Sequence, residues 1–205
     1  MKHLLTFLLV GMIGLLSVNN SYSQAVDDRA VVPVSVTLNS ILRLNVESGG
    51  NVEFNFNTLE QYQNGISGIG TDDQYSTHLT VASSVNYNLE MAAEDDGLTS
   101  TDTVSAGASM SLDYITYQVT LKTSSGFSEG TELTIPSDGT PTQLSTSADI
   151  VQNAGGNAGG VTDNAFRVDW ACGSTADNAH ENLMGSPLTG GRYSTNVFFI
   201  LKPAN

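Results

Sequence analysis

The chain of 205 residues contains 21 Asp and Glu but only seven Lys and Arg, which gives a formal net charge of −14 at pH 7. A chain this acidic repels nucleic acid and anionic lipid, so both are excluded as partners held by charge. Charged residues make up only 14% of the chain. Ser, Thr, Asn, Gln and Gly must therefore cover most of the surface, a composition typical of secreted β proteins.

Residues 1–23 read as a secretory signal peptide. Lys2 and His3 precede the apolar stretch Leu4–Leu16, and a Ser-Tyr-Ser sequence ends the segment at Ser21–Ser23. The apolar stretch has 13 residues, which is short of the roughly 20 that a membrane-spanning helix needs. No cysteine follows it, so lipid attachment there is excluded. We expect cleavage after residue 23, export to the periplasm, cell surface or medium, and no membrane span in the mature chain.

The mature chain, residues 24–205, is long enough for one sizeable core, so we expect a single domain. Its six Lys and Arg stand against 21 Asp and Glu, a net charge of −15. The segment Thr77–Met91 carries the clearest strand pattern, because apolar and polar residues alternate along it. It is either one long strand or two strands bent at Ser83 and Ser84. Its apolar face needs a second layer, which predicts an all-β antiparallel sandwich with long loops.

Two alternating segments come first in the mature chain. Ala30–Leu38 and Leu42–Val46 predict two consecutive strands, or one strand with a bulge. Glu47–Asn51 is a turn by composition, and Val52–Phe56 predicts a short strand that completes a hairpin. The segment Asn57–Tyr75 then loses the pattern and predicts a long loop.

That loop contains Tyr62, Tyr75 and the adjacent carboxylates Asp72 and Asp73. Loops carry function more often than core elements do, so it is the first place to look for a binding surface. The alternative is a solvated connection without a partner.

The second half of the chain contains two further strand patterns and several loops. The apolar phase slips by one residue within Met110–Leu121, which predicts a bulge near Asp113–Ile115. Asn153–Asn164 contains the unit NAGG twice and predicts a flexible loop; it lacks the lysine of a phosphate-binding loop. Phe166–Trp170 predicts a strand with Arg167 and Asp169 on its polar face.

The C-terminal part begins with Ala176–Met184, which has room for one helical turn before the glycines that follow. The last strand runs from Tyr193 to Leu201. Both of its faces are apolar at Phe198–Leu201, which predicts a central or covered strand.

No catalytic motif occurs in the chain, so we predict that the protein is not an enzyme and assign no catalytic residue. His78 and His180 are the imidazoles of the mature chain, and neither lies in a recognisable motif. A Ser-His-Asp arrangement is defined by geometry, so sequence alone leaves that alternative open.

Cys172 is the only cysteine, which excludes an intramolecular disulfide. We expect it to be a small buried residue beside Trp170; an intermolecular bridge or a reactive thiol is the alternative.

Acidic loop residues are the candidate metal ligands, and no cofactor is predicted. Asp27-Asp28, Asp72-Asp73 and Glu94-Asp95-Asp96 supply the oxygen ligands that calcium prefers, without an EF-hand spacing. A structural calcium ion and a solvated acidic turn are both compatible with this pattern. Zinc is disfavoured because one cysteine and two distant histidines form no ligand cluster.

Glycan binding requires exposed aromatic rings, and the candidates are Tyr62, Tyr75 and Trp170. Trp170 shares the phase of Phe166 and Val168, which places it in the core and weakens it as a platform.

Both ends of the mature chain resemble a known family. The sequence PLTGGRYSTNVFFILKP at Pro187–Pro203 resembles the closing motif of bacterial fimbrial-type sandwiches such as the spore coat protein U group. The sequence VVPVSVTLNSILRLNVESGGNVEFNF at Val31–Phe56 is similar to their opening strands. Many members carry paired cysteines, whereas this chain has one. The resemblance implies an Ig-like β-sandwich, export, and a structural or adhesive use at the cell surface.

Two functions follow from these patterns. The first is a structural or adhesive surface protein, a subunit that associates with itself or with other surface proteins through edge strands. The second is a soluble extracellular module that binds carbohydrate or calcium.

Overall fold

The structure is a computed structural model that describes residues 32–71, 74–102, 107–122, 126–174 and 183–204. The predicted signal peptide, residues 1–23, and its predicted cleavage site lie outside these residues. The chain divides into two units, Met1–Leu38 and Asn39–Asn205. Within the described ranges, no helix is both long enough and apolar enough to cross a membrane.

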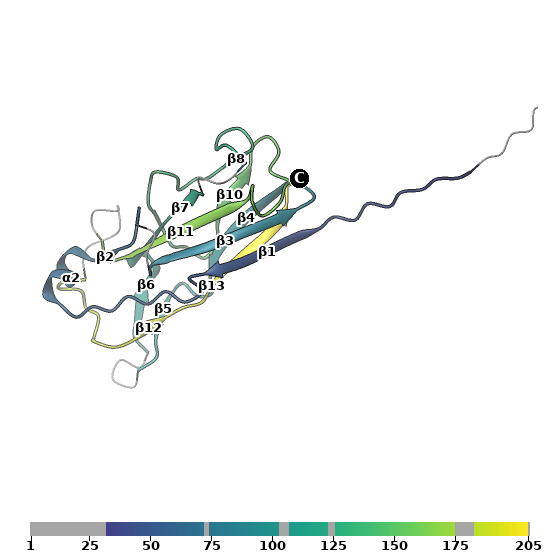
Figure 1. Cartoon of the computed structure of the whole chain (residues 1–205). Coiled ribbons are helices and arrows are strands. Elements are labelled where there is room, and N and C mark those ends of the chain that lie inside the picture. Colours follow the sequence, from purple (N-terminus) through teal and green to yellow (C-terminus); the bar gives the residue numbers. More distant parts are fainter. Residues whose placement is uncertain (1–31, 72–73, 103–106, 123–125, 175–182, 205) are drawn as a thin grey trace, which may run out of the picture. The chain divides into compact units, whose positions relative to one another are not determined.

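The strands of the described chain form antiparallel sheets, which confirms the predicted all-β, sandwich-like fold (Figure 1). The first sheet has the order β1 (Leu42–Ser48), β3 (Ser76–Ser83), β11 (Ala165–Cys172), β7 (Ile115–Leu121) and β9 (Thr142–Gln143), with β2 (Ile66–Ser67) also paired to β11. The second sheet has the order β13 (Val197–Pro203), β4 (Tyr87–Ala93), β10 (Ala148–Asn153) and β8 (Leu133–Thr134). The third has the order β12 (Tyr193–Ser194), β5 (Gly97–Ser100) and β6 (Ser109–Ser111).

The segment Thr77–Met91 forms two strands, β3 and β4, that belong to different sheets. The bend falls at Ser83 and Ser84, one of the two predicted arrangements. The Val85 amide donates to Ser83 Oγ at 3.2 Å, which stabilises the bend. Ser84 Oγ accepts from the Ile41 amide at 2.8 Å and so ties the corner to the start of β1. One continuous stretch therefore supplies the inner face of both sheets.

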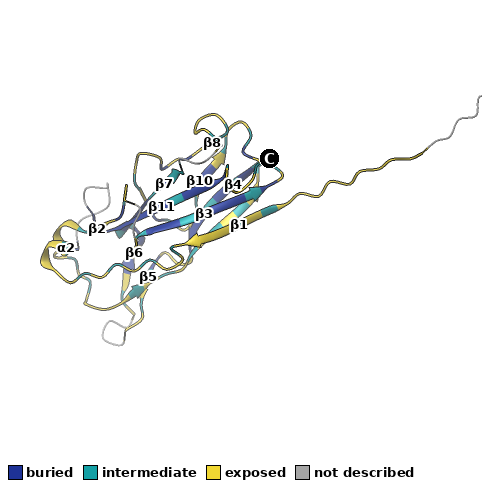
Figure 2. Ribbon diagram, viewed as in Figure 1, coloured by how far each residue is buried: buried dark blue, intermediate teal, exposed yellow. Residues whose placement is uncertain are grey.

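The core lies between the first and second sheets, and most of its side chains are the ones that the alternation predicts; Ile150 and Val151 of β10 are the exceptions in the list below. Each of the following is at most 1% exposed: Leu79, Val81, Tyr87, Leu89, Met91, Val119, Ile150, Val151, Phe166 and Val168. Trp170 is 6% exposed, so its predicted burial with Phe166 and Val168 is confirmed. Figure 2 shows β3 and β11 buried, whereas β1 is exposed over its last residues.

Two predicted N-terminal strands are wrong. Residues 32–41 carry no strand, although Leu42–Val46 does form β1 as expected. Val52–Phe56 also lacks a ladder, so the predicted hairpin does not form. The alternation itself survives in Val52–Phe56, whose apolar residues are half-buried while Glu53 and Asn55 are exposed. A strand needs a hydrogen-bonded neighbour, and alternation does not supply one.

The phase slip in Met110–Leu121 marks a change of sheet and not a bulge. The 3-10 helix η1 (Leu112–Tyr114) separates β6 from β7, which belong to different sheets.

The prediction that Phe198–Leu201 belongs to a central or covered strand is also wrong. β13 pairs with β4 alone in the described chain, and Phe198 and Ile200 on its outer face are 48% and 38% exposed.

The predicted loop Asn57–Tyr75 contains α2 (Leu59–Asn64) in addition to β2. Thr58 and Gln61 form a capping box: Thr58 Oγ1 accepts from the Gln61 amide, and Gln61 Oε1 accepts from the Thr58 amide. This box satisfies the backbone donors of the first turn, and it explains why a helix begins where the strand pattern stops.

The glycine-rich segment Asn153–Asn164 is a loop for the most part, but two of its asparagines are fully buried. Asn157 Nδ2 donates to the Tyr87 carbonyl at 2.9 Å, and Asn157 Oδ1 accepts from the Tyr87 amide at 3.0 Å. Asn164 Oδ1 accepts from the Tyr87 hydroxyl at 2.6 Å. The loop is thus anchored to the start of β4.

Candidate functional site

A groove of about 930 Å³, lined by both polar and apolar residues, reaches the core from the surface and is the main candidate site. Its lining comes from two segments far apart in the sequence, residues 49–56 and 183–199, together with side chains of α2, Val46 and the core. The buried side chains at its base include Thr77, Met110, Ile115, Leu144, Trp170 and Cys172. The core is therefore incompletely covered on this side.

Residues 49–56, here called the strap, lie along the groove without joining a sheet. Gly49 has a φ of +69°, and a Cβ there would lie 2.0 Å from the Ser76 carbonyl oxygen, so only glycine lets the chain leave β1 at this point. Thr77 Oγ1 donates to the Gly49 carbonyl at 2.7 Å and accepts from Trp170 Nε1 at 2.9 Å. The start of the strap is thus fastened to the core.

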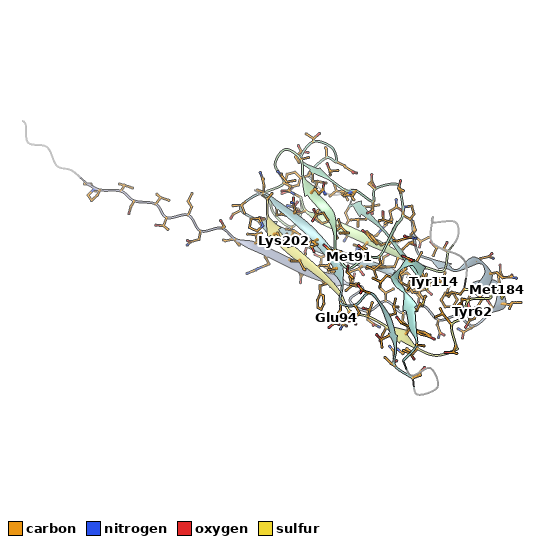
Figure 3. The ribbon with its side chains drawn as sticks, turned by 180° about the vertical axis from the view of Figure 1, so that it is seen from behind. Tyr62, Met91, Glu94, Tyr114, Met184 and Lys202 are labelled. Carbon is orange, nitrogen blue, oxygen red and sulfur yellow. The ribbon has the colours of Figure 1, made fainter. Side chains whose placement is uncertain are left out.

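The aromatic residues of the strap pack against neighbouring rings. Phe54 stacks on Tyr75 with ring centroids 4.8 Å apart, and Phe56 contacts Tyr62 at 5.3 Å. Tyr62 also accepts a backbone hydrogen bond from the Met184 amide at 3.1 Å, and Figure 3 shows these two residues at the same end of the domain. The glycan-platform candidates Tyr62 and Tyr75 are thus engaged with phenylalanines, and Trp170 lies in the core.

Two strands that contribute residues to the groove, β1 and β13, are edge strands. In the described chain β1 pairs with β3 alone, and β13 pairs with β4 alone. Val46 points to the inner side of β1, as does its ladder partner Leu79, yet Val46 is 43% exposed. The inward residues of β13, Val197 and Phe199, are only half-buried. An edge strand leaves one row of backbone donors and acceptors without a ladder partner.

The rim of the groove carries few charges. Arg192 lies 3.7 Å from Glu53 across it, and both side chains are more than half exposed. Such an exposed pair contributes little to stability. It does leave the rim close to neutral, on a chain whose overall charge is strongly negative.

The N-terminal unit supplies the second feature of interest. Val32, Val34, Val36 and Leu38 are 79%, 86%, 78% and 89% exposed. Between Val31 and Leu42 there is no Asp, Glu, Lys or Arg. Exposed side chains in an uncharged, alternating segment resemble a strand without its sheet.

The predicted metal-ligand residues do not come together in the described chain. Glu94, Asp95 and Asp96 are exposed, and Glu94 accepts a hydrogen bond from Asn196. Asp27-Asp28, Asp72-Asp73 and His180 lie outside the described residues, and so does most of Ala176–Met184. Among the described residues, no three His, Cys, Asp or Glu side chains lie close enough to hold a metal ion. His78 lies on β3, opposite Arg167 in the ladder.

Asp169 is fully buried, although its position on the polar face of β11 predicts exposure. Its carboxylate accepts hydrogen bonds from Ser76 Oγ at 2.7 Å and the Gly70 amide at 3.1 Å, and it forms an ion pair with Arg167 Nε at 2.9 Å. These partners satisfy a buried charge, so Asp169 holds the chain before β3 against β11.

Cys172 is also buried, and burial raises the pKa of its thiol to about 12.

No protein-family model and no curated protein matches this chain. A function can therefore be proposed only from the groove, the open edges and the N-terminal segment. The groove could not be found from sequence, because its lining residues come from separate segments. The alternation of apolar and polar residues in Val52–Phe56 is the only local sequence signal for the groove that we identify.

Proposed function

We propose that this chain is an exported structural or adhesive protein of the cell surface, a subunit that assembles with copies of itself through its N-terminal segment. The observation that carries the proposal is the exposure of Val32, Val34, Val36 and Leu38 in a segment that belongs to no strand. Exposed apolar residues with a period of two are costly in water. A sheet edge on another molecule would bury them and satisfy their backbone groups.

The open edges of β1 and β13 support the same proposal, because they give each copy a place to receive a strand. The net charge of −15 in the mature chain opposes contacts through the charged surface. Association is therefore favoured where charges are few, and the N-terminal segment is such a place.

The test compares the mature protein, residues 24–205, with a variant that begins at Asn39. Light scattering after size exclusion and negative-stain microscopy measure the assembly state of each. We expect the longer protein to form oligomers or polymers at high concentration and the shorter one to stay a folded monomer. A mature protein that remains strictly monomeric at millimolar concentration would overturn the proposal.

A further inference from the structure

We propose that the outer face of the second sheet carries a binding site for a neutral saccharide, in a cavity of about 720 Å³ that we call the polar cavity. This inference is independent of the proposed assembly, because no residue of the N-terminal segment lines the cavity. The lining comes from β4, β10 and β13 and the residues beside them. Its polar members are Asn88, Glu90, Ser147, Asp149, Asn153 and Lys202.

The ladder of the second sheet brings two carboxylates of the polar cavity together. Glu90 of β4 lies directly opposite Asp149 of β10. Leu89 and Met91 on either side of Glu90 are at most 1% exposed, so Glu90 points away from the core. Directly opposite residues of an antiparallel pair share a face, with Cβ atoms about 4.5–5.5 Å apart, and like charges there repel each other. Hydroxyl donors placed between the two carboxylates would offset that repulsion.

The Glu90 side chain is held in position, and it is only 13% exposed. One carboxylate oxygen accepts from Ser147 Oγ at 2.8 Å, and the other accepts from Lys202 Nζ. These two donors hold the pKa of the Glu90 carboxyl below its usual range, with Lys202 the larger cause, so Glu90 is an ionised acceptor at neutral pH. Lys202, labelled in Figure 3, is 55% exposed. Its ammonium group has three hydrogens, so donors remain for a ligand beside the fixed acceptor.

Two asparagines extend the set of donors and acceptors. Asn88 Oδ1 accepts from the Asn153 amide at 3.0 Å, which fixes the orientation of the Asn88 side chain and leaves its amide hydrogens for a ligand. Asn153 Oδ1 is buried and has no hydrogen-bond partner among the described residues. A buried acceptor without a donor is costly. A hydroxyl group that enters the cavity would supply the missing donor.

The mixture of charges in the polar cavity favours a neutral ligand. Glu90 and Asp149 repel an anion, and a cation would have to displace Lys202 from Glu90. Within the described part of the chain, no three His, Cys, Asp or Glu side chains lie close enough to hold a metal ion. A saccharide is neutral, and each of its hydroxyl groups both donates and accepts. Neighbouring hydroxyls can therefore donate to the carboxylates and accept from the ammonium and amide hydrogens.

Two exposed apolar side chains of β13 lie beside these polar groups. Ile200 is the ladder partner of Glu90, and Phe198 is a diagonal neighbour of Glu90, about 7–8 Å away. Their side chains share the outer face with Glu90 and are 38% and 48% exposed. One face of a pyranose ring consists of C–H groups, which pack on an aromatic ring while the hydroxyls at the edge reach polar groups. Phe198 therefore supplies the aromatic platform that Tyr62, Tyr75 and Trp170 do not.

Binding can be measured on the mature protein with an array of neutral, uronate-containing and amino-sugar oligosaccharides. We expect neutral oligosaccharides to bind in preference to the charged ones. Isothermal titration with the neutral oligosaccharide that binds best then gives the dissociation constant. Failure to bind any neutral oligosaccharide of the array, or binding to charged ones alone, would overturn the inference.

Three substitutions test whether the ligand lies in the polar cavity. Asp149→Asn and Glu90→Gln each remove one charge with almost no change in size, and Phe198→Leu removes the ring but keeps an apolar side chain. Glu53→Gln is the matched control, because Glu53 also pairs with a cation, Arg192, and does not line the polar cavity. Thermal unfolding monitored by circular dichroism checks that each variant is folded.

We expect Asp149→Asn and Glu90→Gln each to raise the dissociation constant by about tenfold or more, because a hydrogen bond to a charged group is lost. Phe198→Leu should raise it by a smaller factor, and Glu53→Gln should leave it unchanged. An unchanged dissociation constant in all three cavity variants would place the saccharide elsewhere and overturn the inference. Light scattering of the same variants should match that of the unaltered protein, so the proposed function and this inference can fail separately.

Discussion

Trp170 joins the core to the strap through one short chain of contacts. Its indole packs against Tyr117 with ring centroids 6.1 Å apart, and its Nε1 donates to Thr77, which in turn donates to Gly49. Removing the indole leaves a cavity, so we expect Trp170→Ala to lower the free energy of unfolding by roughly 3–5 kcal/mol. Urea denaturation measures the change. Trp170→Phe keeps most of the apolar volume and should cost less; an unchanged midpoint for Trp170→Ala would show that the indole contributes no packing.

Cys172 makes stability depend on pH in the alkaline range. Burial raises the pKa of its thiol from 9.0 to about 12 in the folded protein. The unfolded chain therefore loses the thiol proton at a lower pH than the folded chain, and the unfolded state becomes favoured as pH rises. The contribution of the thiol is fully present below pH 9 and declines between pH 9 and about 12.

We therefore expect Cys172→Ala to lose less stability than the unaltered protein as the pH is raised from 9 to about 12, as measured by urea denaturation. The native thiol should also resist an aromatic disulfide reagent at mildly alkaline pH and react on unfolding. Rapid reaction of the folded protein would contradict this expectation.

At the scale of elements, the anchoring of the glycine-rich loop to β4 through Asn157 can be tested directly. Asn157 occupies the position of a neighbouring strand, since its amide group bonds both the carbonyl and the amide of Tyr87. Asn157→Ala leaves both backbone groups buried without a partner, at about 1–3 kcal/mol for each group. Thermal unfolding should show a clear fall in the melting temperature, whereas the exposed Asn55→Ala should change it little. Equal effects of the two substitutions would show that the loop is not anchored by Asn157.

Alternation predicted β1, β3, β4 and β11 because each has one face in the core, where apolar residues recur with a period of two. It failed at Val52–Phe56 and Val32–Leu38, which have the same pattern but no hydrogen-bonded neighbour. β10 was not predicted, because Ile150 and Val151 are adjacent and interrupt the alternation of apolar and polar residues. The local pattern indicates which residues share one face of a strand. It does not indicate whether a hydrogen-bonded neighbouring strand exists. The groove was not predicted for the same reason, because its lining depends on which segments are neighbours.

At the scale of the whole molecule, the first question is where the mature chain begins. Ser21–Ser23 predicts cleavage just before Gln24. N-terminal sequencing of the exported protein checks this position, and material that still contained Leu4–Leu16 would contradict it. The position matters for the proposed assembly because cleavage there leaves eight residues, 24–31, ahead of the segment Val32–Leu38.

The proposed assembly would make the stability of the molecule depend on its concentration. A partner that binds only the folded domain stabilises it by mass action, by about 1.4 kcal/mol for each tenfold rise in concentration above the dissociation constant. For a domain of this size that corresponds to an increase of about 3–6 °C in the melting temperature.

We expect the melting temperature of the mature protein to rise with concentration in this way, and that of Val34→Asp, which places a charge in the N-terminal segment, to stay constant. Added salt should strengthen association, because copies with a net charge of −15 repel one another and the proposed contact is an uncharged segment. Differential scanning calorimetry at several protein and salt concentrations measures both effects. Association that weakened with salt would show that charged contacts, and not the apolar segment, hold the copies together.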